Sequence, residues 1–258
     1  MIRINKNIDI YQKEDVVNKY ARHTFLLEPE KKILSIIKDE IKNAKVLDIG
    51  VGGGRTTLHF SKKAKMYVGI DYSSKMIDIC NEKYGTYDTI SFKVLDARNL
   101  DSLGRKYFDI ILFSYNGLDC IDIKHRKNVL EGITKLLKDG GKFIFSMHNI
   151  NHIKFMYNLY SGYNPIMHIK KFHRIIRLLV HNGFPAKYEK MDYTQFTDSA
   201  HNFRNTHTYS SLPAEINTLK HLGYSSIRAF SCNNGDEIML EDLGTYTEPW
   251  IYFYCSKE

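Results

Sequence analysis

Lys45-Val-Leu-Asp-Ile-Gly-Val-Gly-Gly-Gly-Arg55 is the stretch of sequence that decides the fold. Its first five residues form a short apolar run that is typical of a buried parallel strand, and residues 56–63 after it have the spacing of a helix. Glycines in such a turn let the backbone bend sharply and approach a ligand closely, and the following helix offers free amides at its N-terminus. The stretch therefore predicts a strand, a ligand-binding turn and a helix.

The spacing of the glycines argues against a nicotinamide dinucleotide site. That fingerprint is G-x-G-x-x-G, in which the third glycine permits close packing of the helix on the strand. Counted from Gly50, the third position holds Arg55, and counted from Gly52, it holds Thr57. The pattern present is D-x-G-x-G-x-G, which begins at Asp48.

Short apolar runs alternate with helical stretches on both sides of this turn. Residues 16–43 are predicted to be helical, with a break near residues 27–29. Gly140 and Gly141 are predicted to cap a helix that ends at residue 137. The alternation predicts an α/β fold, with a doubly wound, mostly parallel, seven-stranded sheet covered by helices on both faces. The other predicted strands are residues 66–70, 90–95, 108–113, 142–147, 226–231 and 250–255, and the other helices are residues 74–83, 125–137 and 213–222.

The alternation stops between residues 149 and 210, where we predict only a helix near residues 169–181 and extended runs at residues 187–196 and 203–209. A stretch of this length with little regular pattern is more often a functional lid than a passive loop. The predicted organisation has three parts. They are N-terminal helices and a cofactor-binding core at residues 1–148, an inserted acceptor lid at residues 149–210, and the C-terminal end of the core at residues 211–258.

Composition excludes several classes of protein. Of the 258 residues, 43% are hydrophobic and 26% are charged, which are ordinary globular proportions and exclude wholesale disorder. The four cysteines form no C-x-x-C pair, so the zinc-ribbon and redox motifs fail on spacing. The N-terminus lacks the apolar segment of a secretory signal, and no apolar run approaches the roughly 18 residues of a membrane span. The sequence therefore predicts a cytoplasmic protein with no membrane partner.

The formal net charge of +8 is spread along the chain in pairs such as Lys31-Lys32 and Lys170-Lys171, with acidic residues among many of them. A nucleic-acid-binding protein usually gathers its basic residues on one face or helix. We therefore interpret the charge as a solvated basic surface that is compatible with an anionic substrate, and nucleic acid is a disfavoured partner.

Acidic residues end the next two predicted strands. Asp71 comes at the end of one, where a carboxylate can accept hydrogen bonds from both hydroxyls of a ribose. Asp96 follows the other, where a carboxylate can accept from the amine of adenine. Either acid alone can also be the N-cap of a helix. Together with the glycine-rich turn, the two acids predict an adenosine site.

These motifs resemble those of the class I S-adenosylmethionine-dependent methyltransferases. The resemblance is close over residues 11–137 and looser from residue 213 onward. Five motifs occur in the family's order, which is far more specific than a glycine signature alone. They are VLDIGVGGGR at residues 46–55, YVGIDYSSKMI at 67–77, FKVLDAR at 92–98, FDIILFSYNGLDCI at 108–121 and VLEGITKLLKDGGKFIFSM at 129–147.

The resemblance implies a sheet of the class I methyltransferase type, with S-adenosyl-L-methionine as cofactor and S-adenosyl-L-homocysteine as product. It also implies a role for individual residues, although helix surface or core packing is an equal alternative for the three N-terminal ones. The implied roles are Gly50, Gly52 and Gly54 along the methionine and ribose, Asp71 on the ribose, Tyr72 and Met76 beside the adenine, Asp96 and Ala97 at its edge, Ser114 beside the methionine, and Tyr11, Tyr20 and Arg22 closing over the cofactor, with Arg22 on its carboxylate.

Methyl transfer from a sulfonium is an in-line displacement, so the protein mainly has to align and desolvate the reactants. A hydroxyl acceptor benefits from a general base, whereas an amine needs only to be neutral. By position the candidates are His148, Tyr115, Asp119 and Asp122, with His201 and His207 as unranked rivals, and each is also suited to a hydrogen-bonding role in a loop. We expect no metal, because His148 and His152 stand four apart without an acidic third ligand.

The expected acceptor is a small molecule. Enzymes of this class that methylate a base amine usually carry N/D-P-P-Y/F after the fourth strand, and residues 114–117 read Ser-Tyr-Asn-Gly. The insertion offers rings with polar tips, which suit a sugar, a nucleotide-sugar or a metabolite amine. A methyltransferase acting on tRNA or rRNA and a non-catalytic cofactor-binding module stay as alternatives, and the oligomeric state stays open, a homodimer included. The rings of the insertion are Tyr157, Tyr160, Tyr163, Phe172, Tyr188, Tyr193, Phe196, Phe203 and Tyr209.

Overall fold

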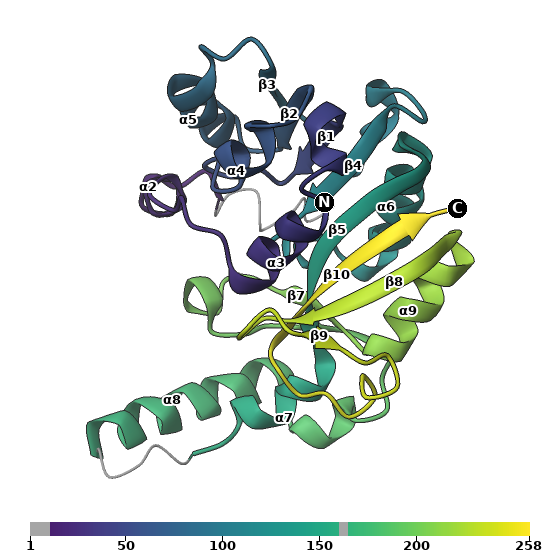
Figure 1. Cartoon of the computed structure of the whole chain (residues 1–258). Helices are drawn as coiled ribbons and strands as arrows, with labels where there is room; N and C mark the ends of the chain where they lie inside the picture. Colours follow the sequence, from purple (N-terminus) through teal and green to yellow (C-terminus); the bar gives the residue numbers. More distant parts are fainter. Residues whose placement is uncertain (1–10, 160–164) are drawn as a thin grey trace.

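The computed structural model describes residues 11–159 and 165–258, and its centre is one ten-stranded sheet (Figure 1). Eight strands follow one another in the order β3-β2-β1-β4-β5-β10-β8-β9, while β7 pairs with both β5 and β6. The first five strands of that order are parallel, and β10 runs antiparallel to β5 and β8. The strands are β1 (Lys45–Ile49), β2 (Met66–Asp71), β3 (Ile90–Val94), β4 (Phe108–Phe113), β5 (Leu137–Asn149), β6 (Tyr193–Phe196), β7 (His207–Ser210), β8 (Tyr224–Ser231), β9 (Glu237–Ile238) and β10 (Trp250–Lys257).

Helices connect these strands and cover both faces of the sheet (Figure 1). The α-helices are α2 (Glu14–Ala21), α3 (Glu28–Ile36), α4 (Thr57–Ser61), α5 (Ser74–Tyr84), α6 (Ile123–Leu136), α7 (Ile153–Met156), α8 (Pro165–Asn182) and α9 (Leu212–His221). The 3-10 helices are η1 (Glu40–Asn43), η2 (Leu100–Leu103), η3 (Gly117–Cys120), η4 (Ile150–His152), η5 (Pro185–Tyr188) and η6 (Ala200–Asn202). None of the helices described is long and apolar enough to cross a membrane.

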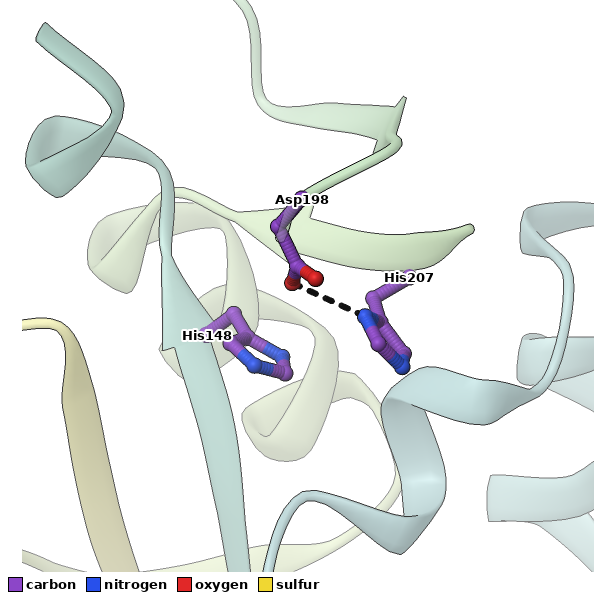
Figure 2. A group of neighbouring side chains, drawn as sticks. All are labelled: His148, Asp198 and His207. Carbon is purple, nitrogen blue, oxygen red and sulfur yellow. Dashed lines mark hydrogen bonds and ion pairs between the residues drawn. The ribbon is translucent and has the colours of Figure 1, made fainter. Parts of the chain in front are cut away.

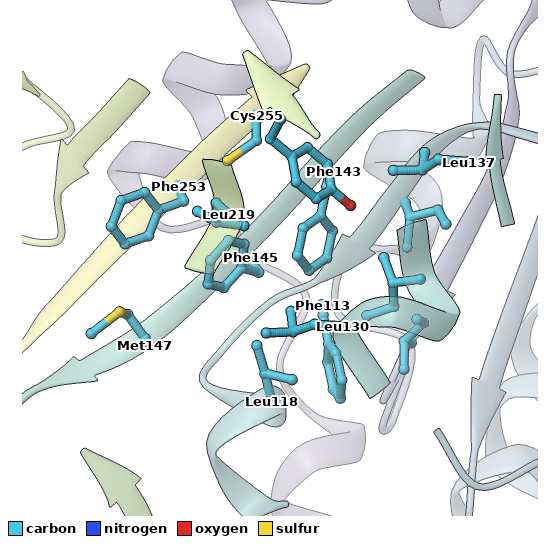
Figure 3. Packing of buried hydrophobic residues seen from close by; sticks show 14 of the residues in the cluster. Phe113, Leu118, Leu130, Leu137, Phe143, Phe145, Met147, Leu219, Phe253 and Cys255 are labelled. Atoms are coloured by element: carbon cyan, nitrogen blue, oxygen red, sulfur yellow. The ribbon is translucent and has the colours of Figure 1, made fainter. Parts of the chain in front are cut away.

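The central strands are apolar on both sides because both of their faces are buried. In β5, Phe143 and Phe145 pack with α6 and α9 on one face (Figure 3). Ile144 packs with α3 on the other face. The same alternation occurs in β4, where Ile111 and Ile110 belong to opposite layers. Continuous apolar runs in the sequence therefore become a core with two layers.

The predicted glycine-rich turn lies directly after β1. Gly50 and Gly52 have φ angles of +65° and +53°, a region that side chains disfavour. A Cβ on Gly53 would lie 2.7 Å from the backbone of Ala21, so α2 packs directly on the turn only because this position lacks a side chain. Thr56 closes the turn by donating a short hydrogen bond to Asp48, which also accepts one from the hydroxyl of Tyr67 at 2.6 Å.

A buried ion pair ties the N-terminal helices to this turn. The guanidinium of Arg55 donates to both carboxylate oxygens of Glu30, in α3, at 2.5 Å each. Glu30 is 1% exposed and also accepts from the hydroxyl of Tyr252, in β10, at 3.0 Å. Arg55 further donates to the carbonyl oxygen of Phe25 and to Ser114 Oγ, at the end of β4. One bidentate pair thus connects α3, the glycine turn, β4 and β10.

The insertion at residues 149–210 contributes two strands to the sheet and one helix that lies away from it. β6 and β7 form an antiparallel pair, and β7 lies parallel to the end of β5, with Tyr209 opposite His148 and Ser210 opposite Asn149. α8 projects from the body of the molecule (Figure 1). Tyr160 and Tyr163 lie outside the described residues.

Two expectations about the fold were wrong in detail. The sheet has ten strands rather than seven, because the insertion contributes β6 and β7 and a two-residue strand, β9, pairs with β8. Gly140 and Gly141 do not cap a helix. α6 ends at Leu136, Leu137 is already extended, and β5 runs through both glycines.

The buried pair gives a stability test. Glu30→Ala leaves the buried charge of Arg55 without its partner, and such a loss costs about 3–5 kcal/mol. The matched control is Glu28→Ala in the same helix, where Glu28 pairs with Lys31 at 2.6 Å on the exposed surface; exposed pairs contribute about 0–1 kcal/mol. Chemical unfolding of the two variants measures the difference. Equal losses of unfolding free energy would contradict the role given to Glu30.

Candidate functional site

A cavity lies over the carboxyl ends of β1, β2, β3 and β4. This is where ligands bind in open α/β sheets. Ten of the twelve residues predicted to hold the cofactor line it, together with the catalytic candidate Tyr115. The ten are Tyr11, Tyr20, Gly50, Gly52, Asp71, Tyr72, Met76, Asp96, Ala97 and Ser114.

Asp71 is the buried acid of this cavity, with 8% of its surface exposed. Its Oδ2 accepts from the backbone N–H of Gly52 at 3.0 Å, and its Oδ1 accepts from that of Ser73 at 2.8 Å. Burial raises the pKa of Asp71 to about 6, against the two backbone hydrogen bonds, which lower it. Each carboxylate oxygen keeps a further lone pair, so the group can accept two more hydrogen bonds from a ligand.

Asp96 lies further along the cavity and has a partner of its own. Arg98 donates to both of its carboxylate oxygens, with the closest contact at 2.5 Å, and Arg98 also lines the cavity. Tyr72, Met76 and Ala97 surround the same end of the cavity with apolar surface. A flat ring with an exocyclic amine fits between these groups.

Two predicted residues do not line the cavity. Arg22 follows the last residue of α2 and its side chain is exposed, while the next residue, His23, lines the cavity instead. The Nδ1 of His23 is buried and has no hydrogen-bond partner. Gly54 lies under the cavity, where a Cβ would meet the ring of Tyr84 at 2.5 Å. At the end of α2 the structure therefore places His23, and not Arg22, at the cavity.

The turn after β4 is strained at two residues. Tyr115 and Asn116 have φ angles of +54° and +57°, which non-glycine residues rarely adopt. Two hydrogen bonds hold the turn: the N–H of Tyr115 donates to Tyr252 Oη at 3.2 Å, and the N–H of Asn116 donates to Ser146 Oγ at 2.7 Å. Such strain persists where the surroundings over-determine it, often at functional sites. Here the turn directs Tyr115 to the cavity and the amide of Asn116 to His148.

His148 and Asp119, which were predicted separately, form a buried pair. Asp119 Oδ2 accepts from His148 Nδ1 at 2.9 Å and from the backbone N–H of His148 at 2.6 Å. Arg126 donates to the other oxygen of Asp119 at 2.8 Å and to Glu215 at 3.0 Å. Because a carboxylate only accepts, the proton of the neutral imidazole lies on Nδ1. His148 Nε2 then keeps its lone pair, toward which the amide of Asn116 points at 3.2 Å.

A second histidine–carboxylate pair lies beside the first. Asp198 Oδ2 accepts from His207 Nδ1 at 2.9 Å and from the hydroxyl of Tyr209 at 3.0 Å. The rings of His148 and His207 stack with centroids 5.2 Å apart. Burial lowers the pKa of His207, but its hydrogen bonds to Asp198 and Cys120 outweigh burial and raise the pKa to about 10. At neutral pH this pair is therefore an imidazolium beside a carboxylate.

His148, Asp198 and His207 are also the one group among the described residues whose ligand atoms could share a metal ion, since these atoms lie within 4.8 Å of one another (Figure 2). The side chains of these three residues already have hydrogen-bond partners in the protein. Both nitrogens of His148 are engaged by Asp119 and Asn116, and the other oxygen of Asp198 accepts from the N–H of Ala200 at 2.7 Å. The hydrogen bonds account for the group without an ion, and we assign no metal to it.

The loop after β6, in the insertion, contacts two residues that line the cavity. His201, Asn202 and Phe203 all have positive φ angles, between 47° and 62°. The ring of His201 stacks on Tyr20 at 6.5 Å and meets the edge of Tyr11 at 5.4 Å. Burial raises the pKa of Tyr20 to about 12, so its hydroxyl remains a donor at neutral pH. This loop therefore covers the two tyrosines that close the cofactor side of the cavity.

Comparison with known proteins shows similarity to methyltransferases in sequence and in fold. The family described as a methyltransferase domain matches residues 46–141. A ubiquinone biosynthesis O-methyltransferase from Coxiella burnetii is 27% identical over 124 residues, which are 46% of this chain and 50% of that protein. A putative S-adenosylmethionine-dependent methyltransferase from Listeria monocytogenes has a TM-score of 0.59 at 15% identity, over 89% of this chain and 98% of that one. Residues 46–141 thus match a methyltransferase domain, and the chain has the fold of S-adenosylmethionine-dependent methyltransferases.

A methyltransferase of similar fold was solved with two bound ligands. It is the 1,6-didemethyltoxoflavin-N1-methyltransferase of Burkholderia thailandensis, bound to 1,6-didemethyltoxoflavin and S-adenosylhomocysteine, with a TM-score of 0.57 at 14% identity over 98% of this chain and 86% of that one. At this identity the likeness shows the fold alone. The chain spans about half the length of the curated relatives it matches.

The His207–Asp198 pair makes stability depend on pH. The pKa of His207 is about 10 in the folded protein and about 6.5 in an unfolded chain. Its stabilisation is therefore complete below about pH 6.5 and is lost as the pH rises toward 10. We expect the melting temperature of the wild type to fall between pH 7 and 9.5 more steeply than that of His207→Gln. His221→Gln, at an exposed histidine, is the control. A wild-type slope in His207→Gln would contradict the assigned pair.

Proposed function

We propose that the protein binds S-adenosylmethionine in the cavity and transfers its methyl group to an oxygen or nitrogen of a small-molecule acceptor. The observation that carries the proposal is the buried carboxylate of Asp71, placed beside a glycine turn with two lone pairs left for a ligand. Two vicinal hydroxyls of a ribose satisfy both oxygens at once. No other acid among the described residues of the cavity combines burial, a neighbouring glycine turn and this unused capacity.

The other cavity residues fit the remaining parts of the same cofactor. Tyr72, Met76 and Ala97 offer apolar surface to the adenine, and Asp96 offers an acceptor to its amine. The unpartnered Nδ1 of His23 is suited to the carboxylate of the methionine part, the role that the sequence assigned to Arg22. Arg55 cannot take that role, because its guanidinium is held by Glu30.

The cofactor supplies an activated methyl group, so the protein has to align the acceptor and exclude water. Tyr11, Tyr20 and His201 form an aromatic cover at the cavity. This supports the proposal that residues 149–210 act as the acceptor lid, because His201 comes from that insertion. A sugar, a nucleotide-sugar or a metabolite amine stays the acceptor proposed from the sequence, and four rings of the insertion, Tyr188, Phe196, Phe203 and Tyr209, pack in a cluster of their own.

His148 is our proposed general base, with Asp119 as its positioning partner and Tyr115 as the side chain that orients the acceptor. Asp119 fixes the imidazole tautomer and leaves the lone pair on Nε2, which is what a base for a hydroxyl acceptor requires. Asn116 now occupies that lone pair at 3.2 Å, so His148 acts as a base only when this amide turns away from Nε2. The pair supports oxygen as the methylated atom, and so does the O-methyltransferase among the relatives.

Calorimetry with S-adenosylhomocysteine tests the cofactor. Wild-type protein should bind it and should not bind NAD. Asp71→Asn should weaken binding at least tenfold, because a hydrogen bond to a charged group is worth about 1.5–3 kcal/mol. Since the pKa of Asp71 is about 6, wild-type affinity should also fall as the pH drops below 6, whereas the affinity of Asp71→Asn should stay flat.

The matched control is Asp101→Asn, at an exposed acid outside the cavity, which should keep both the affinity and its pH dependence. Circular dichroism confirms that each variant is folded. A folded Asp71→Asn protein with wild-type affinity would mean that Asp71 only caps the turn of Gly52 and Ser73.

A second experiment tests the base. With an acceptor found by screening for transfer of a labelled methyl group, His148→Gln should lower kcat by about 10²–10⁴-fold. Asp119→Asn should lower kcat too and shift its pH profile. Both variants should bind S-adenosylhomocysteine as tightly as the wild type, because neither residue lines the cavity. Unchanged kcat in His148→Gln would remove His148 from the mechanism.

A further inference from the structure

The outer face of α8 is apolar and exposed. Ile166, Ile169, Phe172, Ile176 and Val180 follow one another at intervals of three or four residues, which places them on one face of the helix. Their exposed fractions run from 42% at Ile176 to 78% at Val180. Among the described residues, nine of the eighteen large apolar side chains that are exposed lie between residues 155 and 184. This concentration is unlike the scattered apolar residues of an ordinary surface.

The inner face of the same helix is docked on the protein. Leu178 is fully buried, and Arg174 donates to the carbonyl oxygen of Met156 at 3.2 Å. Arg177 donates to the side-chain oxygen of Asn202 at 2.5 Å and to its carbonyl oxygen at 3.0 Å. The helix is therefore held in place by its polar contacts, while the apolar face that would normally be buried is turned outward, on the arm that projects from the body (Figure 1).

The segment of sequence that contains α8 is basic. Residues 149–188 contain six lysines and arginines and four histidines, and no aspartate or glutamate. The segment thus carries most of the chain's net charge of +8. From the sequence, the charge was interpreted as a solvated surface spread along the chain, because lysine pairs occur throughout it. The absence of acidic residues over 40 positions becomes significant only next to the exposed apolar face.

We propose that α8 is a membrane-surface helix, which lies on a bilayer containing anionic lipid. Apolar side chains on one face, basic residues beside them and no acidic residue are the properties of helices that insert one face at the boundary of headgroups and acyl chains. Four lysines and arginines within its eighteen residues make α8 a helix that lies in the interface plane. A second copy of the chain fits the charge pattern poorly, because two such arms bring positive charge against positive charge.

A chain of side-chain contacts connects α8 with the residues that line the cavity. Arg177 packs over the ring of Phe203 at 4.2 Å, and His181 stacks on the same ring at 5.5 Å. Phe203 ends the strained loop whose His201 covers Tyr11 and Tyr20. A bilayer under α8 therefore holds the loop that covers Tyr11 and Tyr20. This proposal replaces the expectation of no membrane partner, and it does not depend on the proposed methyl transfer.

Co-sedimentation with lipid vesicles tests the proposal. Wild-type protein should bind vesicles of equal parts phosphatidylcholine and phosphatidylglycerol at least tenfold more tightly than vesicles of phosphatidylcholine alone, and added salt should weaken the binding. Ile169→Glu/Val180→Glu should reduce the binding at least tenfold. Both positions are more than 70% exposed, so the double variant should fold and should bind S-adenosylhomocysteine like the wild type.

The matched control is Met239→Glu/Leu240→Glu, which adds the same charge at two exposed apolar positions far from α8 in the sequence. It should bind the anionic vesicles like the wild type. Equal binding by the two double variants would overturn the proposal. So would light scattering that shows a lipid-free dimer, dissociated by Ile169→Glu/Val180→Glu, together with no vesicle binding, because a second copy would then cover the apolar face.

Discussion

The buried pair between Glu30 and Arg55 is the interaction on which the architecture around the cavity depends. A charge inside a protein is tolerated only with a partner, so each of these residues fixes the other. Arg55 belongs to the glycine turn and Glu30 to α3, while Tyr252 and Ser114 bring β10 and β4 to the same pair. The glycine turn is thus joined through this pair to three elements, α3, β4 and β10.

The acceptor side is built differently, from polar pairs under aromatic rings. His148–Asp119 and His207–Asp198 stand side by side because β7 continues the sheet next to the end of β5. One pair belongs to the core and the other to the insertion, so the insertion completes the interior as well as covering it. The strained loop at residues 201–203 then connects this interior with α8. The proposed acceptor lid and the proposed membrane contact are therefore parts of one continuous structure.

The local sequence pattern was enough to predict the strands that carry the cavity. Strands such as Lys45–Ile49 and Phe108–Phe113 are continuous apolar runs bounded by turn residues, and the structure has them at the predicted bounds. Asp71 was predicted because the end of a parallel strand places it over the sheet whatever the rest of the chain does. The partners across the fold were missed, because Glu30, Arg55 and Tyr252 are joined only by tertiary packing, and nothing in their local sequence marks a buried pair.

In the insertion, the sequence predicted a helix but not its contacts with the rest of the protein. A helix near residues 169–181 was predicted from its spacing, but the spacing alone does not reveal which face meets the protein. His207 was noted as a candidate without a rank, since only the β5–β7 pairing brings it to His148. Arg22 was predicted at the cavity, but the structure has the next residue, His23, there. The end of α2 decides which side chain turns inward. A sequence specifies these elements well, whereas their contacts come from the assembled fold.

A crystal structure of the protein grown with S-adenosylhomocysteine tests the central claim most directly. We expect the ligand in the cavity, with both ribose hydroxyls on the carboxylate of Asp71, the adenine between Tyr72 and Ala97, and the amino-acid carboxylate within reach of His23. The sulfur should then face the turn that carries Tyr115 and Asn116. A ligand bound elsewhere, or a ribose that leaves Asp71 without a ligand contact, would contradict the account.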